Sequence, residues 1–360
     1  MPIEAVLAID LAAVAANWRL LRDRHPGGAV AGVVKADAYG LGAAEVGPAL
    51  RDAGCRHFFV AHLAEGVALR AALGPEPVIA VLNGFAPGAD GDAALLPVLN
   101  GLPDVDAHAA AARRRGRAAP AVLHLDTGMA RLGLDAREQE AAAADPSRLH
   151  GLDLRWLMTH LACADEPGHP LNAAQAARFA AACARLPVAA PRSVANSSGM
   201  FLGPAFASDL ARPGCALYGI NPTPGRPNPM RQAVRLDAPV LQVREIAAGD
   251  TVGYGATWTA KRPSRVATVA AGYADGYLRA LSGRASGAFA GRSVPLIGRV
   301  SMDLTAFDVT DAPGIAPGAA ISLIGPPGNT PDDLAERAGT IGYEVLTSLG
   351  RRYRREYRAA

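Results

Sequence analysis

The chain has 360 residues, of which 50% are hydrophobic and 19% are charged, and its formal net charge is +3. This length exceeds the roughly 100–200 residues usual for one domain, so we expect two domains or a barrel with an appendage. The balance of hydrophobic and charged residues excludes an intrinsically disordered chain.

The N-terminal part begins with a predicted helix and a predicted buried strand. Asp10 suits the N-cap of a helix whose apolar residues recur every three or four positions, and the sequence PGG at 26–28 ends it. Residues 29–34 (AVAGVV) then form a short apolar run typical of a buried parallel strand. Lys35 follows at the C-terminal tip of this strand.

Seven similar apolar runs follow, separated by Ala-rich stretches of helical composition. They lie at 58–61, 78–82, 95–99, 121–125, 152–158, 193–195 and 215–218. Eight strands that alternate with helices predict a (β/α)₈ TIM-like barrel, and we assign residues 1–230 to it.

Several predicted strands end in polar residues. These are Lys35, His62, Asn83, Asp126, His160 and Asn196. The C-terminal strand ends build the active site of such barrels, so the chemistry is expected there.

A second domain is predicted after the Pro- and Gly-rich loop at 221–228. Short runs at 240–243, 266–270, 294–297, 305–309 and 321–323 are bounded by turns and lack helical crossovers. Two short helices are expected late, after Thr330 and after Thr340. We therefore expect a mainly β-strand domain over 231–360, with which the first few residues of the chain pair.

Partners and compartment follow from charge and cysteine usage. A basic run between Arg351 and Arg358 is interpreted as a solvated or dimer-facing tail, so nucleic acid is not an expected partner. The four cysteines are scattered without C-x-x-C spacing, which predicts neither a metal site nor a disulfide framework. The N-terminus (MPIE) lacks the features of a signal peptide, and no apolar run reaches membrane-spanning length. We expect a cytoplasmic protein with no membrane partner.

Lys35 precedes a Gly-rich turn (ADAYGLG) and is the first candidate for covalent chemistry. A partly desolvated lysine is neutral often enough to attack an aldehyde and form a Schiff base. From spacing alone, an ordinary ion-pairing lysine remains an open alternative.

Nine motifs in chain order resemble those of the alanine racemase family and cover nearly the whole chain. They are VVKADAYG (33–40), DTGMARLG (126–133), MTHLA (158–162), ANSS (195–198), RPGCALYG (212–219), VGYGAT (252–257), GYADG (272–276), GRVSMD (298–303) and YEV (343–345).

This resemblance implies that Lys35 holds pyridoxal 5'-phosphate as a Schiff base. It further implies that Tyr273, contributed by the other subunit, is the second base of a two-base interconversion of L-alanine and D-alanine. The chain would then be a homodimer with shared active sites that supplies D-alanine for peptidoglycan.

The motifs carry further implied roles. The expected cofactor-binding residues besides Lys35 are Tyr39, Arg131, His160, Asn196, Ser197, Arg212, Gly214, Cys215 and Tyr343. Arg212 would face the pyridine nitrogen and keep it unprotonated, because a guanidinium donates hydrogen bonds and stays charged. The expected substrate-binding residues are Arg131, Met302 and Tyr254.

One position departs from the family pattern. Many members carry a carbamylated lysine seven residues before the equivalent of Arg131, where this sequence has His124. Histidine cannot supply that stable carboxylate, so either another group, such as an acidic residue or a bound anion, holds Arg131, or His124 donates to a further group.

Two alternatives stay open at this point. A serine or broad-specificity racemase would use the same scaffold, because a pocket discriminates only about 1–3 kcal/mol per methylene. A non-catalytic pyridoxal-phosphate carrier would share the barrel but would leave the second domain without a purpose.

Overall fold

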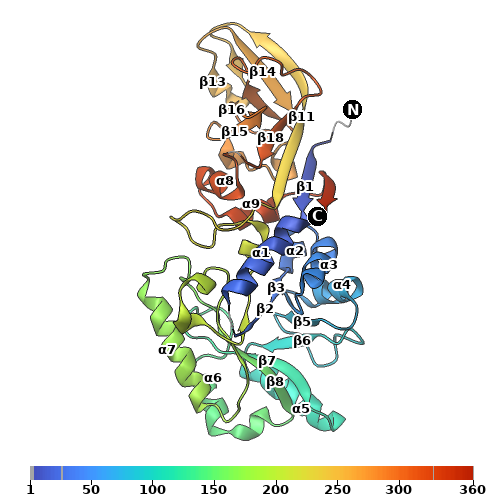
Figure 1. The fold of residues 1–360 in the computed structure, drawn as a ribbon, viewed down its shortest axis with the longest axis vertical. Coiled ribbons are helices and arrows are strands. Elements are labelled where there is room, and N and C mark those ends of the chain that lie inside the picture. Colours follow the sequence, from blue (N-terminus) through green and yellow to red (C-terminus); the bar gives the residue numbers. More distant parts are fainter. Residues whose placement is uncertain (1–3, 26, 327, 360) are drawn as a thin grey trace.

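The computed structural model describes residues 4–25, 27–326 and 328–359. Met1–Ile3 of the N-terminal segment, and Pro26 of the predicted helix end, lie outside the described residues. An α/β barrel occupies one end of an elongated molecule, and a mainly β-strand part occupies the other (Figure 1). The predicted combination of a (β/α)₈ TIM-like barrel and a mainly β domain is confirmed.

The barrel is built from short parallel strands with helices between them. Its strands are β2 (Ala29–Val30), β3 (Gly32–Val33), β4 (His57–Val60), β5 (Val78–Val81), β6 (Leu96–Leu99), β7 (Ala119–His124), β8 (Leu152–Met158), β9 (Arg192–Ser193) and β10 (Leu210–Ala211). Its helices are α1 (Leu11–Arg24), α2 (Lys35–Gly40), α3 (Ala43–Ala53), α4 (Leu63–Leu73), α5 (Leu102–Arg115), α6 (Ala136–Ala144) and α7 (Pro170–Arg185). Asp10 caps α1 as predicted, accepting a hydrogen bond from the amide of Ala13 at 2.8 Å.

The first predicted strand is divided at Ala31, and this division closes the barrel. β3 begins the sheet that runs through β4 to β9, while β2 pairs in parallel with β10. The amide of Ala31 donates to the carbonyl of Ala211 at 2.9 Å, and the amide of Arg212 donates to the carbonyl of Ala195 at 2.8 Å. These bonds join β10 to both neighbouring segments of the ring.

The predicted strand at 215–218 is wrong. Cys215–Tyr218 is a 3₁₀ turn, and the eighth strand is β10, five residues earlier. The run is apolar because it is buried, and burial alone does not separate a strand from a short helical segment. Tyr218 is fully buried, and its hydroxyl donates to the carbonyl of Val33 at 2.9 Å.

The second part is a sheet whose strands are mostly antiparallel. Its strands are β11 (Val234–Ile246), β14 (Ser264–Val269), β15 (Ser286–Phe289), β16 (Arg292–Ile297), β17 (Thr305–Asp308) and β18 (Ala320–Ile324), with a separate hairpin of β12 (Thr251–Val252) and β13 (Trp258–Thr259). The sheet order is β14-β17-β16-β15-β18-β11, and a further pairing of β14 with β11 closes these strands into a ring. The predicted late helices are α8 (Pro331–Ala338) and α9 (Gly342–Ser348).

The two ends of the chain extend this sheet. β1 (Val6–Asp10) pairs antiparallel with β11 and parallel with β19 (Arg354–Arg358). The basic run is therefore a strand over its second half rather than a tail, although Arg351, Arg352, Arg354 and Arg358 are exposed to solvent. The charged side chains of β19 are compatible with its position at the edge of the sheet, where they discourage pairing with other chains.

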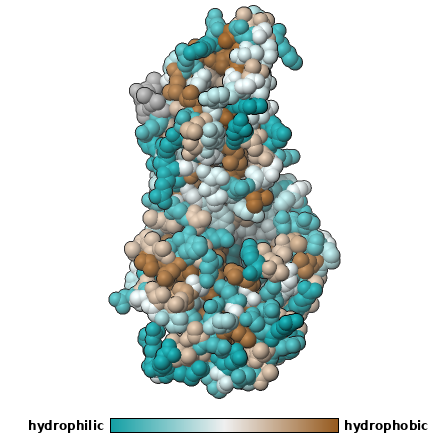
Figure 2. Space-filling view, turned by 180° about the vertical axis from the view of Figure 1, so that it is seen from behind, coloured by the Kyte–Doolittle hydropathy of each residue, from teal (hydrophilic) through white to brown (hydrophobic). Residues whose placement is uncertain are grey.

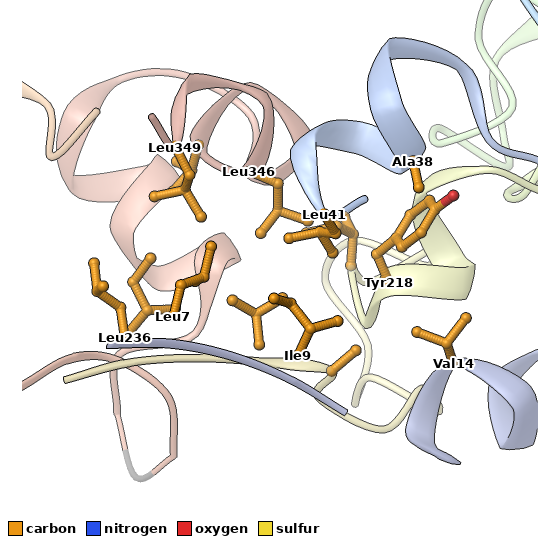
Figure 3. Close-up of a cluster of buried hydrophobic side chains, with 14 of the residues drawn as sticks. Leu7, Ile9, Val14, Ala38, Leu41, Tyr218, Leu236, Leu346 and Leu349 are labelled. Carbon is orange, nitrogen blue, oxygen red and sulfur yellow. The ribbon is translucent and has the colours of Figure 1, made fainter. Parts of the chain in front are cut away.

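A single hydrophobic cluster connects the barrel to the second part. Leu7 and Ile9 of β1 lie between Leu236 of β11, Leu346 of α9 and Tyr218 at the barrel wall (Figure 3). All five side chains are fully buried. The two parts therefore share one core around β1.

Polar and apolar residues are interspersed over the face seen from behind (Figure 2). Within residues 4–25, 27–326 and 328–359, none of the helices combines the length and the apolar character needed to cross a bilayer.

Asn17 offers a test of how α1 is fixed to the segment that joins the two parts. Its buried side-chain amide donates to the carbonyls of Leu217 and Arg231 and accepts from the amide of Arg231 at 2.7 Å. Asn17→Ala leaves these backbone groups unsatisfied, and we expect it to lower the free energy of unfolding by about 3 kcal/mol. Equilibrium denaturation at one fixed protein concentration measures the change.

The exposed Arg19 on the same helix provides the control. Arg19→Ala is expected to change the free energy of unfolding by less than about 0.5 kcal/mol. Equal effects of the two substitutions would contradict the role given to Asn17.

Candidate active site

A cavity of about 900 Å³ opens at the C-terminal ends of the barrel strands. All ten of the expected cofactor-binding residues line it. They are Lys35, Tyr39, Arg131, His160, Asn196, Ser197, Arg212, Gly214, Cys215 and Tyr343. Residues more than 300 positions apart in the sequence thus meet in one site.

Lys35 is the first residue of α2, whose backbone forms a left-handed turn rather than an ordinary α-helix. The four residues from Ala36 to Tyr39 all have φ between 53° and 57°, a region that L-residues other than glycine rarely adopt. Glu65 holds the beginning of this turn, because its carboxylate accepts from the amide of Ala36 at 2.7 Å and from the amide of Ala61 at 2.7 Å. The side chain of Asp37 accepts from the amide of Ala43 at 2.8 Å and holds the end.

The environment of Lys35 favours a neutral amine. Burial lowers the pKa of Lys35, and the positive charge of Arg131 lowers it further, while Glu65 and Cys215 act in the opposite direction. The only other lysine in the chain is Lys261, which is exposed in the second part. Lys35 is therefore the sole amine side chain at the barrel mouth.

Tyr39, Tyr218 and Tyr343 form an aromatic wall beside the lysine. The rings of Tyr39 and Tyr218 lie 4.8 Å apart, and Tyr343 meets Tyr39 edge-on at 6.4 Å. The backbone at Gly214 approaches the hydroxyl of Tyr39 so closely that a Cβ atom there would lie 2.2 Å from it. Only glycine fits at this position.

Ser197 and Asn196 shape the floor next to Gly214. The Ser197 hydroxyl accepts from the amides of Gly214 at 2.9 Å and Ala216 at 3.3 Å, at the start of the 3₁₀ turn. The Asn196 side chain accepts from the amide of Gly199 at 2.8 Å, which fixes the loop after β9. Hydroxyl and amide groups thus converge on one corner of the cavity.

Arg212 and His160 also line the cavity, and Arg212 is buried while His160 is partly buried. The guanidinium of Arg212 donates to the carbonyl of Thr159 at 2.6 Å and to the hydroxyl of Ser193. Burial lowers the pKa of Arg212 to about 9, so it remains charged at neutral pH. Burial first, and then the charges of Arg212 and Arg131, hold the pKa of His160 well below its usual range, so its imidazole is neutral.

Three of the sequence-predicted site residues lie outside this cavity. Tyr254, Tyr273 and Met302 do not line it, and their side chains are 71%, 42% and 54% exposed on the second part. Tyr273 and Met302 occupy adjoining turns, since the amide of Ala274 donates to the carbonyl of Met302 at 2.9 Å. The Tyr273 turn is anchored by Asp275, which forms an ion pair with Arg352 at 2.6 Å.

Sequence reasoning missed two residues that support the site. Asn100 directly follows β6, so the rule that singled out the other strand ends also applies to it. Glu65 gives no sequence signal of its own, because its role depends on the bend that brings Ala36 to the start of α4. The described residues contain no group of three or more His, Cys, Asp and Glu side chains suited to a metal ion.

Two family models match successive parts of the chain. The family model described as the alanine racemase N-terminal domain matches residues 9–222, and that of the C-terminal domain matches residues 233–357. The chain belongs to the alanine racemase family. It is 58% identical to the alanine racemase of Acidiphilium cryptum, over 97% of each chain. It is 49% identical to a catabolic alanine racemase of Mesorhizobium japonicum, over 98% of this chain and 93% of that one.

The fold of this family member also matches solved structures along nearly its whole length. The alanine racemase of Bartonella henselae, solved with covalently bound pyridoxal phosphate, superposes with a TM-score of 0.94 at 39% identity. The match covers 99% of this chain and all of that one.

The charges around Lys35 predict how fast an amine reagent modifies it in the cofactor-free protein. Glu65→Gln removes a negative charge, so the pKa of Lys35 falls and its modification at pH 8 speeds up. Arg131→Met removes a positive charge, so this pKa rises and modification slows. We expect changes of roughly threefold or more in opposite directions.

Peptide mass spectrometry over a range of pH measures these rates, with Lys261 as the internal reference. Its rate should stay the same in both variants. If the two substitutions shift the Lys35 rate in the same direction, local geometry rather than charge governs its reactivity.

Proposed function

We propose that the chain interconverts L-alanine and D-alanine with pyridoxal 5'-phosphate held on Lys35. The observation that carries this proposal is the meeting of a single, depressed-pKa lysine with the predicted cofactor residues in one cavity. The high identity to named alanine racemases along nearly the whole chain supports the same activity.

The residues present fit the proposed cofactor. Gly214 lies where any Cβ atom would collide with Tyr39, and the hydroxyl of Ser197 and the start of the 3₁₀ turn converge there. Hydroxyls and backbone amides of this kind suit a phosphate dianion. We assign Tyr39, Ser197, Tyr343, Gly214 and Cys215 to the phosphate, with Asn196 fixing the loop beside them.

When bound, pyridoxal phosphate acts as an electron sink for a carbanion at the substrate Cα. The protein must then hold and move one proton on each face of that carbon. Lys35 is suited to one face, because burial and the charge of Arg131 favour its neutral amine.

Arg212 and His160 set the electrostatics of the ring-binding corner. Two guanidinium hydrogen bonds of Arg212 are used by Thr159 and Ser193, which fixes the plane of the group and leaves its other N–H groups to donate to the cofactor. A donating cation at the pyridine nitrogen keeps that atom unprotonated. His160, held neutral, is assigned to pack against the ring.

Tyr273 of a second copy is the proposed base for the other face. Within one chain Tyr273 lies outside the cavity, and its side chain is 42% exposed. Met302 and Tyr254 also lie outside the cavity and are more exposed. We propose a homodimer in which residues 231–360 of each chain deliver these side chains to the partner's barrel, built from residues 1–230. Arg131 and the partner copies of Met302 and Tyr254 would then bind the substrate.

Alanine is the proposed substrate in preference to serine. Tyr343 lines the same cavity as Lys35, and we assign its bulky side chain to favour a methyl-sized substrate side chain. A cofactor carrier would have no use for the exposed Tyr273 turn. We retain the cytoplasm as the location and D-alanine for peptidoglycan as the product's destination, although two relatives are named as catabolic.

The first experiment is an absorbance spectrum of the purified protein before and after borohydride, paired with exchange of the Cα hydrogen in deuterated water. We expect an absorbance band of the Schiff base that disappears on reduction, and a covalent label on Lys35 but not on Lys261. L-Alanine should exchange faster than L-serine, and D-alanine should accumulate.

A labelled Lys35 without exchange would favour the carrier, whereas faster exchange of serine would favour the broader racemase. No label at Lys35 after incubation with pyridoxal phosphate would contradict the cofactor assignment itself.

Mixed dimers test the shared active site. Lys35→Ala and Tyr273→Phe chains should each lose at least about 100-fold in turnover, because each lacks one proton-transfer group. When the two are mixed and exchange subunits, one site of each mixed dimer is complete, so we expect up to a quarter of the wild-type activity from a statistical mixture.

Subunit exchange is verified with differently tagged chains. Sites formed within one chain would give no recovery in mixed dimers, since each chain would then hold one incomplete site.

A further inference from the structure

Asn100 and His124 form a partly buried side-chain pair next to the loop that carries Arg131. The side-chain amide nitrogen of Asn100 donates to the carbonyls of Leu82 at 2.9 Å and Val98 at 3.2 Å. Its oxygen must therefore face the other way, where it lies 2.8 Å from Nδ1 of His124. An amide oxygen only accepts, so Nδ1 of His124 carries the hydrogen.

This arrangement leaves Nε2 of His124 with a lone pair. Nε2 is bonded to none of the described residues, and His124 lines the cavity. The ring is only 8% exposed, so the orientation set by Asn100 is maintained by packing. His124 thus offers the cavity one fixed hydrogen-bond acceptor.

The loop that carries Arg131 folds back over this ring. The amide of Leu134 donates to the carbonyl of His124 at 2.8 Å, and a Cβ atom on Gly133 would lie 3.1 Å from the imidazole. Asp126 accepts from the amides of residues 128–130 and so holds the start of the loop. The Arg131 guanidinium has no hydrogen bond or ion pair with any of the residues described.

The charges around His124 favour the neutral acceptor form. Burial, followed by the positive charge of Arg212 and that of Arg131, lowers the pKa of His124 to about 4, although Asp126 opposes the shift. His160 is also close and is itself neutral. Near neutral pH, His124 can therefore accept a hydrogen bond from a cation.

We propose that Asn100 locks His124 in the Nδ1–H tautomer so that its Nε2 accepts a hydrogen bond from Arg131 and aims this guanidinium at the substrate carboxylate. His124 and Asn100 are positioning residues in this role. Arg131 carries the positive charge, and His124 with Asn100 orients its guanidinium. This pair adds no negative charge to the site. The inference rests on the proposed function of Arg131 as the carboxylate ligand.

The tautomer is tested directly on the holoenzyme. Long-range ¹H–¹⁵N NMR spectra of protein with ¹⁵N-labelled histidine distinguish a protonated from an unprotonated ring nitrogen, and His124→Gln assigns the signals. We expect Nδ1 protonated and Nε2 unprotonated at pH 7. An imidazolium or the Nε2–H tautomer would overturn the proposal, and this outcome does not depend on which substrate the enzyme uses.

The coupling to Arg131 is tested with propionate, a carboxylate that lacks an ammonium group. His124→Leu is expected to weaken its binding about tenfold or more, because the hydrogen bond to a charged group is lost. In an Arg131→Met background the same substitution should have little further effect. His124→Gln, whose amide oxygen can accept, should recover part of the affinity.

His108 provides the matched control. It is 6% exposed in the same barrel and is bonded through one ring nitrogen to the carbonyl of Phe85 at 2.8 Å, but it does not line the cavity. His108→Leu should leave propionate affinity within about twofold. Equal losses from His108→Leu and His124→Leu, or additive losses from His124→Leu and Arg131→Met, would show a structural role only.

Failure of the proposed function is separable from failure of this inference. If Arg131→Met leaves propionate binding unchanged, Arg131 is not the carboxylate ligand, whatever the tautomer of His124. If Arg131→Met abolishes binding while His124→Leu and His124→Gln do not alter it, the positioning role is wrong and the carboxylate assignment stands.

Discussion

The left-handed turn after Lys35 is the constraint on which the rest of the structure depends. Four consecutive residues from Ala36 to Tyr39 adopt this conformation at a cost of about 1–2 kcal/mol each. Tertiary hydrogen bonds must offset that cost, and they come from the barrel and from the second part of the molecule. Glu65 holds the first amide of the turn, and Arg355 of β19 donates to the carbonyl of Gly40 at 2.7 Å. The strain is therefore maintained where the reactive lysine has to be aimed.

The same turn also brings the second part of the molecule into contact with the cavity of its own chain. A Cβ atom on Gly40 would lie 2.7 Å from the carbonyl of Leu346, so α9 packs directly against the turn. α9 also carries Tyr343 into the cavity. Because β1 and β19 join the shared core around Leu7 and Ile9, loosening the terminal strands would loosen the support of Lys35 as well.

The sequence predicted the elements whose signals are local and missed those set by tertiary contacts. The strands from 29–34 to 193–195 and the cap at Asp10 were found because β-branched runs and capping residues act locally. The left-handed turn was not predicted, since alanine and tyrosine have no preference for that region. The run at 215–218 was taken for a strand because burial made it apolar throughout. Most site residues were predicted from motifs that resemble those of the family. Glu65 and Asn100 lie outside these motifs, so they were not predicted.

The distribution of cations gives the site its chemical selectivity. Lys35, Arg131 and Arg212 line one cavity, and their combined field favours an anionic cofactor and a carboxylate substrate. A guanidinium stays protonated near neutral pH and is a poor nucleophile, so arginines supply charge without competing for an aldehyde. With Lys261 remote in the second part, the chain holds one cavity amine, and burial together with the charge of Arg131 lowers its pKa. The positive charge of Arg131, which favours anions in the cavity, thus also favours the neutral form of its single lysine.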